Sequence, residues 1–151
     1  MAERATEAGL TISQALGHQG LTGVALRNLG RIALKLGEYG KALSYYCQNL
    51  QVVQEAGHQR ATFLAVEDIA YLLIKVGQHH EVAVRFLGAA ATLRRETGIP
   101  VPDQQQAAYE QSCATLRQRL GEEIFAAQWQ AGQTTPLAQI VAEAMTLSLQ
   151  Q

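Results

Sequence analysis

Cysteine is scarce in this chain of 151 residues, and neither sign of charge is in excess. The two cysteines, Cys47 and Cys113, stand far apart and belong to no CxxC or Cys/His spacing, which excludes a disulfide framework and a cysteine-based metal motif. We therefore expect free thiols in a reducing compartment, the cytoplasm. Twelve basic and thirteen acidic residues leave a net charge of −1, so no basic excess can neutralise phosphates and we expect no direct nucleic-acid partner.

Long hydrophobic runs and strand-like alternation are also missing. No apolar run approaches the roughly 20 residues that cross a bilayer, so we expect no membrane partner. The amino terminus, Met1 to Arg4, lacks the apolar core of a secretion signal. Apolar residues make up 48% of the chain, which excludes general disorder, and the length suits one domain with a buried core.

What the chain does contain is a repeat with an offset of 40 residues, from 26 to 66 and from 46 to 86. The matched positions are Leu26/Val66, Leu29/Ile69, Gly30/Ala70, Gly37/Gly77, Ala42/Val82 and Tyr46/Phe86, together with Gly17-His18-Gln19 and Gly57-His58-Gln59. A fixed period of this size is typical of stacked helical hairpins and resembles a tetratricopeptide repeat, whose period is about 34 residues. The longer period here indicates a longer second helix in each hairpin.

Apolar residues at helical spacing, separated by glycines, predict helices over about 2–16, 21–36, 39–56, 61–76 and 80–96. In the second of these, the predicted apolar stripe is Val24, Leu29, Ile32, Ala33 and Leu36. The predicted fold is all-α: tetratricopeptide-like antiparallel hairpins, forming a right-handed α-solenoid with a C-terminal helical cap.

Residues 1–98 form the repeat region in this prediction, with a half repeat at 2–20 and repeats at about 21–60 and 61–98. Segment 2–16 aligns with 42–56, the second helix of a hairpin, so the chain starts in the middle of a repeat. We expect a fragment of a longer protein; the alternative is a short protein with a capping helix at this end.

The period stops after Gly98, where Pro100 and Pro102 interrupt helix formation. Three more helices are predicted over about 103–120 and 122–130 and from Thr135-Pro136 onward. We expect residues 99–151 to be a helical cap that packs on the same domain and covers the last exposed face of the repeats.

Two segments of the chain resemble a known family. Residues 86–98 (FLGAAATLRRETG), followed by two prolines, and residues 120–132 (LGEEIFAAQWQAG) resemble the C-terminal tetratricopeptide region of large bacterial signalling ATPases, the LuxR-type (MalT-like) and AfsR-like transcriptional regulators. The resemblance implies a regulatory module attached to an ATP-hydrolysing switch. This chain has no GxxxxGK[ST] phosphate-binding loop and no recognisable helix-turn-helix segment, so those functions would belong to other parts of the parent protein.

The first helices of the two hairpins are predicted to line the concave face of the solenoid and to bind a partner. Their partner-facing residues are predicted to be Arg27, Asn28, Arg31, Lys35, Glu67, Asp68, Tyr71 and Lys75. Arg27 and Arg31 are suited to grip a carboxylate of a partner peptide, because a guanidinium group matches two oxygens. The alternative is that they pair with Glu67 and Asp68 on the neighbouring helix and fix its register.

No constellation in the sequence indicates catalysis, a metal or a cofactor. His79 and His80 are adjacent and face different ways on a helix, so we expect solvated turn residues there. The Glu122-Glu123 pair suits the start of a helix. Trp129 and Phe125 are predicted to belong to the core of the cap; the alternative is a partner-binding anchor.

The predicted function is therefore a non-catalytic regulatory module, which binds a protein, a peptide or a small effector for a parent signalling protein. The alternative is a free-standing adaptor that holds a partner peptide in its concave groove. The first helix is also expected to expose apolar side chains, so we predict a homodimer through Leu10, Ile12 or Leu16.

Overall fold

The computed structural model describes residues 2–15 and 17–150, and that part of the chain is built from helices without any strand. The predicted all-α class is therefore confirmed. The helices are α1 (Ala2–Ala15), α2 (Gln19–Lys35), α3 (Tyr39–Glu55), α4 (Gln59–Val76), α5 (His80–Thr97), α6 (Asp103–Leu120), α7 (Glu122–Thr134) and α8 (Leu137–Thr146). No helix in residues 2–15 and 17–150 has the length and apolarity needed to cross a membrane.

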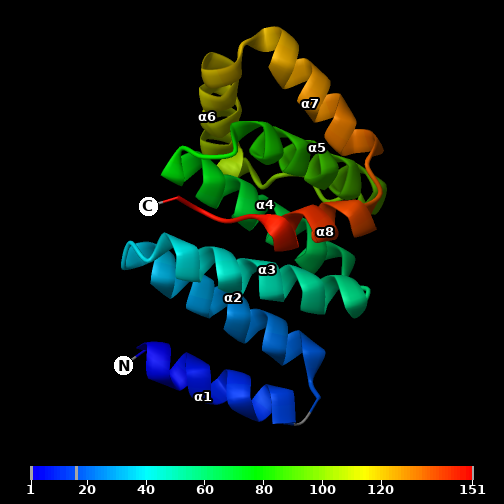
Figure 1. The fold of residues 1–151 in the computed structure, drawn as a ribbon. Helices are drawn as coiled ribbons and strands as arrows, with labels where there is room; N and C mark the ends of the chain where they lie inside the picture. The colour runs from blue at the N-terminus through cyan, green and yellow to red at the C-terminus, as the bar shows by residue number, and fades with distance from the viewer. Residues whose placement is uncertain (1, 16, 151) are drawn as a thin grey trace.

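The first five helices are stacked in sequence order, each packed on the one before it, with α1 at one end of the molecule (Figure 1). α6 and α7 lie at the other end, where α7 packs closely along α5. α1 is held to α2 partly by the hydroxyl groups of Ser13 and Thr22, which are 2.9 Å apart and buried. α3 packs against both α2 and α4.

Three helices extend beyond their predicted limits. α2 and α4 begin two residues earlier than predicted, at Gln19 and Gln59, directly after the N-cap residues His18 and His58. His18 Nδ1 accepts a hydrogen bond of 3.2 Å from the backbone N–H of Leu21, which satisfies one free donor of the first turn. α7 continues to Thr134, past the predicted end at 130, so Gly132 lies inside the helix.

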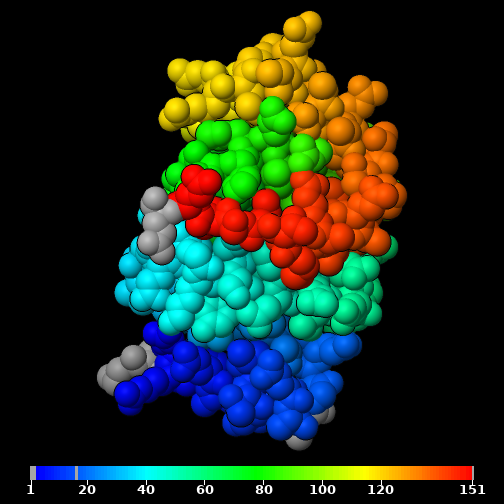
Figure 2. Space-filling view, viewed as in Figure 1, coloured from blue at the N-terminus to red at the C-terminus, as the bar shows by residue number. Residues whose placement is uncertain are grey.

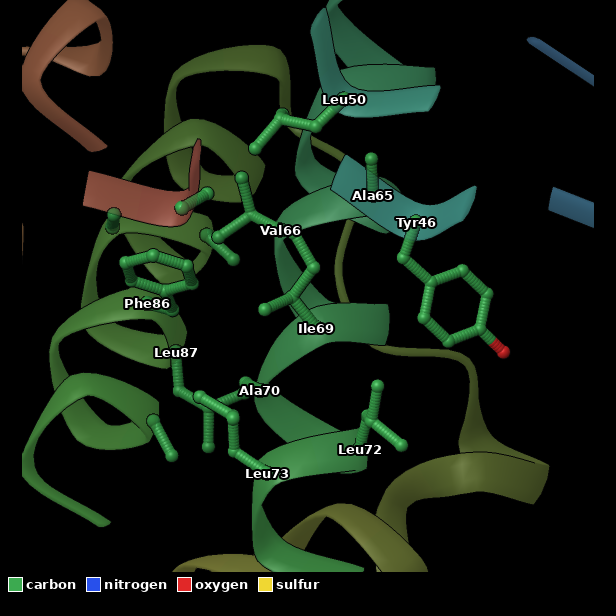
Figure 3. Close-up of a cluster of buried hydrophobic side chains, with 14 of the residues drawn as sticks. Tyr46, Leu50, Ala65, Val66, Ile69, Ala70, Leu72, Leu73, Phe86 and Leu87 are labelled. Carbon is green, nitrogen blue, oxygen red and sulfur yellow. The ribbon is translucent and has the colours of Figure 1, made fainter. Parts of the chain in front are cut away.

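The main core lies between α3, α4 and α5, and its buried side chains include Leu50, Val66, Ile69 and Phe86 (Figure 3). Tyr46 lies at the edge of this cluster, and its hydroxyl oxygen points away from it (Figure 3). The ring of Tyr46 packs against Gly30 of α2, where an added Cβ would lie 2.5 Å from Tyr46 Cε1. A glycine is therefore needed at position 30 for α2 and α3 to approach this closely.

The predicted apolar stripe of α2 is only partly buried. Leu29 and Ala33 belong to the core, but the side chains of Val24 and Leu36 are 57% and 60% exposed. The prediction had placed Val24 on the buried side of α2, but the buried residues are its neighbours Ala25 and Leu26. The spacing identified an amphipathic helix correctly, but the buried side is set by where α1 and α3 lie, and they leave Val24 and Leu36 uncovered.

α8 and residues 147–150 lie along the side of the stack rather than at its end, as Figure 2 shows. α8 packs on α3 and α5, and the Cys47 thiol donates a hydrogen bond of 3.4 Å to the carbonyl oxygen of Ala144. The side-chain amide of Gln78 exchanges two hydrogen bonds, of 2.7 and 2.8 Å, with the backbone of Gln150. The structure thus divides segment 99–150 between an end position (α6 and α7) and a side position (α8), where Ile140 and Ala144 are buried.

Candidate functional site

A groove of about 790 Å³ lies between α2 and α4, and we call it the α2/α4 groove. It is lined by Thr6, Asn28, Arg31, Ile32, Leu34, Lys35, Tyr46, Asp68, Tyr71, Leu72 and Lys75. Asn28, Arg31, Lys35, Asp68, Tyr71 and Lys75 were all among the predicted partner-facing residues. They come together because they lie on facing sides of α2 and α4 at helical spacings of three and four.

Arg27 forms an ion pair with Asp68 beside the groove. Arg27 Nε lies 2.7 Å from Asp68 Oδ2, and its Nη2 lies 3.2 Å from Oδ1, so the guanidinium group engages both carboxylate oxygens. Burial raises the pKa of Asp68, and the hydrogen bond from Arg27 opposes that shift. Two alternatives were predicted for Arg27: binding a carboxylate of a partner peptide, or pairing with Glu67 and Asp68. The structure shows the second, as an ion pair with Asp68 of α4.

Glu67 does not line the groove, because the residue is only 4% exposed and its carboxylate is turned into the protein. It receives two hydrogen bonds from Arg94, 2.7 Å from Nε and 2.8 Å from Nη2. Arg94 Nη1 also donates to the carbonyl oxygens of Ile99 and Pro100, at 3.3 and 2.9 Å, and its guanidinium carbon lies 4.4 Å from the centre of the Phe63 ring. Glu67 thus joins α4 to α5 and to the segment that leads into α6.

The cations that remain in the α2/α4 groove are Arg31, Lys35 and Lys75, all of them exposed. None of the three lies within 4 Å of a carboxylate oxygen among residues 3–15 and 17–150. The single carboxylate of the lining, Asp68, is already matched by Arg27. The groove therefore carries three positive charges that no nearby ion pair neutralises.

Two tyrosines add hydrogen-bonding groups to the α2/α4 groove. Burial raises the pKa of Tyr46 to about 12, and it raises the pKa of Tyr71 as well. Both hydroxyl groups therefore stay protonated near neutral pH, where each can donate one hydrogen bond and accept others. Tyr46 was predicted only as a packing residue, and its place in the lining depends on the ring passing beneath Gly30, which the sequence pattern does not reveal.

The histidines occupy positions at helix ends. His79 precedes α5 in the left-handed conformation (φ 55°), and its Nε2 lies 2.8 Å from the carbonyl oxygen of Ser148. Among the residues that the structure describes, no group of three or more His, Cys, Asp or Glu side chains is placed to hold a metal ion.

An apolar surface is exposed where α1 and α2 meet, at the end of the stack. We call it the α1/α2 surface; its exposed members are Ile12, Leu21 and Val24, each more than half exposed. Leu10, also predicted to be exposed, is half-buried. Leu16, the third predicted contact residue, lies outside the described residues.

Comparisons of the chain with protein-family models, with curated proteins and with solved structures found no match. The fold and the groove together define an all-helical domain with a cationic, tyrosine-containing groove between two of its helices.

Proposed function

We propose that this chain is a non-catalytic protein-interaction and regulatory module, a part of a larger bacterial signalling or transcriptional regulator that acts in the cytoplasm. The observation that carries the proposal is the α2/α4 groove, a concave surface with three unneutralised cations. The resemblance of segments 86–98 and 120–132 to LuxR-type regulators supports the regulatory role. The 40-residue repeat and the sequential stacking of α1 to α5 support a tetratricopeptide-like right-handed solenoid, with α2 and α4 on its concave side.

The alternative is a free-standing adaptor that binds a partner peptide in the same groove. It rests on the same observation, because the groove suits an extended or helical segment whichever larger protein presents it. In both proposals, the positive charge of the α2/α4 groove is the main determinant of which partner binds.

The chemistry of the groove favours an acidic protein segment over a basic or neutral one. Guanidinium and ammonium groups form charge-assisted hydrogen bonds with carboxylates, and Arg31 offers the two-pronged form. Asn28 and the hydroxyl groups of Tyr46 and Tyr71 add uncharged hydrogen-bonding groups for the peptide backbone. Since the three cations are exposed, binding should weaken as salt rises, because salt screens exposed charges.

We expect charge reversal in the groove to reduce binding of an acidic peptide. The probe is a fluorescein-labelled peptide rich in Asp and Glu, measured by fluorescence anisotropy against a Lys/Arg-rich peptide of equal length. The triple variant Arg31→Glu/Lys35→Glu/Lys75→Glu should bind the acidic peptide at least roughly tenfold more weakly, a loss of about 1.4 kcal/mol or more.

Arg60→Glu is the matched control, because Arg60 is an exposed cation at the start of α4 and lies outside the groove lining. It should leave the affinity within roughly twofold of the parent chain. An acidic peptide that binds the triple variant as tightly as the parent would contradict the proposal. Equal affinity for acidic and basic peptides would contradict the predicted charge preference.

We also propose that the α1/α2 surface associates with a second copy of the chain, since exposed apolar patches favour association. Multi-angle light scattering should show the mass rising from monomer toward dimer as concentration increases. Ile12→Glu should keep the chain monomeric, whereas Ile124→Glu, which alters an exposed apolar residue on α7, should not. A monomer at every concentration, or equal sensitivity to both substitutions, would contradict the dimer.

A further inference from the structure

A second cavity, about 550 Å³ in volume, lies between α6 and α7 and has no role in the function proposed above. We call it the α6/α7 groove; it is lined by Gln106, Tyr109, Glu110, Cys113, Arg117, Glu122, Phe125, Ala126 and Trp129. The α6 residues and the α7 residues each follow helical spacings of three and four, so one face of each helix forms a wall. The size is within the range of small-ligand sites in proteins, about 300–1,000 Å³.

The α7 wall of this groove is aromatic. The rings of Phe125 and Trp129 are stacked, with their centres 5.7 Å apart and their planes 22° apart. Tyr109 contributes a third, half-buried ring from α6. Aromatic faces carry negative electrostatic potential and attract cations.

One cation of the chain itself already uses this property. The guanidinium carbon of Arg117 lies 4.5 Å from the centre of the Phe125 ring, and Arg117 Nε lies 3.3 Å from Glu122 Oε1. Ring and carboxylate therefore hold this positive charge together at one end of the groove. The faces of Trp129 and Tyr109 have no such cation over them among the residues that the structure describes.

The other carboxylate of the groove, Glu110, is not matched by a cation. It accepts a hydrogen bond of 3.4 Å from the amide of Gln106, and no Lys, Arg or His nitrogen of residues 3–15 and 17–150 lies within 4 Å of it. Burial raises the pKa of the Cys113 thiol in this groove; the Arg117 charge opposes the shift, and the Glu110 charge adds to it. After Arg117 and Glu122 are paired, one negative charge is left beside the free rings.

The aromatic wall is held in place by unusually close packing of α7 on α5. Gly88 of α5 lies against the carbonyl oxygen of Trp129, and Gly132 of α7 lies against the carbonyl oxygen of Arg85, so closely that a Cβ would fit at neither glycine. The side chain of Arg85 also donates a 2.7 Å hydrogen bond to Gln128 Oε1. The backbone that carries Trp129 is therefore fixed before any ligand binds, which reduces the entropy cost of binding.

We propose that the α6/α7 groove binds an organic cation, with the charged group placed between the rings of Trp129 and Tyr109 and the carboxylate of Glu110. The cation is an ammonium or guanidinium group. It comes either from a small free organic cation or from a Lys or Arg side chain of a partner, two sources that share this chemistry. The contact between the Arg117 guanidinium group and the Phe125 ring is the same kind of cation–aromatic interaction, formed within the chain.

Trp129 is the only tryptophan of the sequence, so its fluorescence reports directly on this groove. The intact chain is titrated with choline and, separately, with the amide of Nα-acetyl-lysine and that of Nα-acetyl-arginine, at constant ionic strength. The uncharged isosteres are 3,3-dimethylbutanol for choline and the amide of Nα-acetyl-norleucine for lysine. We expect a saturable change in Trp129 fluorescence with at least one cation. The uncharged isostere of that cation should bind roughly fivefold or more weakly. Preference for choline indicates a small free organic cation, and preference for an amino-acid amide indicates a partner side chain.

Glu110→Gln should weaken binding of the cation roughly fivefold or more, since it removes the unmatched negative charge and keeps the shape of the side chain. Glu123→Gln is the matched control, because Glu123 is an exposed carboxylate of α7 outside the groove lining. Both positions are exposed, and circular dichroism should show both variants folded. No saturable change with any of the cations, equal binding of the uncharged isosteres, or equal effects of the two variants would overturn the proposal.

Discussion

Replacing Arg94 by methionine is expected to destabilise the fold by about 3–5 kcal/mol, because removing one partner of a buried ion pair leaves the other charge uncompensated. Glu67 and Arg94 are 4% and 7% exposed, so water cannot replace the lost hydrogen bonds without opening the core. The substitution also leaves the carbonyl oxygens of Ile99 and Pro100 without this donor, which loosens the segment before α6. Urea unfolding followed by circular dichroism measures the change.

The double variant Glu67→Leu/Arg94→Met distinguishes the effect of an unpaired buried charge on stability from the effect of lost packing. It should recover most of the stability lost in Arg94→Met, because replacing both members of a buried pair by apolar residues is often close to neutral. Arg27→Met is the control, since the Arg27–Asp68 pair is more exposed and its loss should cost about 1 kcal/mol or less. If Arg94→Met were no more harmful than Arg27→Met, the buried pair would not have the role described here.

Replacing Gly88 by alanine is expected to cost about 3 kcal/mol, since overpacking of a well-packed contact typically costs about 1–3 kcal/mol and both groups here are held by helices. The new methyl group would meet the backbone carbonyl of Trp129, which cannot rotate away as a side chain could. α7 would have to move off α5, and the environment of Trp129 would change with it. Urea unfolding followed by tryptophan fluorescence reports both effects.

Gly40→Ala is the control for this substitution. Gly40 lies in the first turn of α3, and within the described part of the chain no atom outside its own helix turn lies within 4 Å of the position that its Cβ would take. Alanine there should leave stability unchanged or raise it by up to about 1 kcal/mol, since alanine is the better helix former. Gly88→Ala with the stability of the parent chain would mean that α5 and α7 are not packed as closely as described.

The repeat and the apolar spacing in the sequence predicted helices close to α1 to α5, and six of the eight predicted partner-facing residues line the α2/α4 groove. Positions 40 residues apart have equivalent places in successive helical pairs, so Arg31 and Tyr71, on α2 and α4, line one cavity. Gly77, predicted to end a helix, does so in the left-handed conformation with φ 78°. These features follow from local spacing, which sequence patterns describe well.

Features that depend on contacts between distant segments were not predicted. The Glu67–Arg94 pair joins two helices at positions with no periodic relation, and nothing in the local sequence marks Arg94 as different from Arg95. The sequence predicted a helix from Thr135-Pro136 onward, but not that this helix, α8, packs on α3 and α5. Gly88 and Gly132 did carry a signal, because glycine inside a helix is costly and often marks a close approach.

A titration of the isotope-labelled chain with the unlabelled acidic peptide, followed by NMR, tests whether the α2/α4 groove is the partner-binding surface. We expect chemical-shift changes concentrated on α2 and α4, at Asn28, Arg31, Lys35, Tyr71 and Lys75, and we expect these changes to be lost in Arg31→Glu/Lys35→Glu/Lys75→Glu. Changes concentrated instead on α3, α5 and α8, or no saturable change on any helix, would contradict this role of the groove.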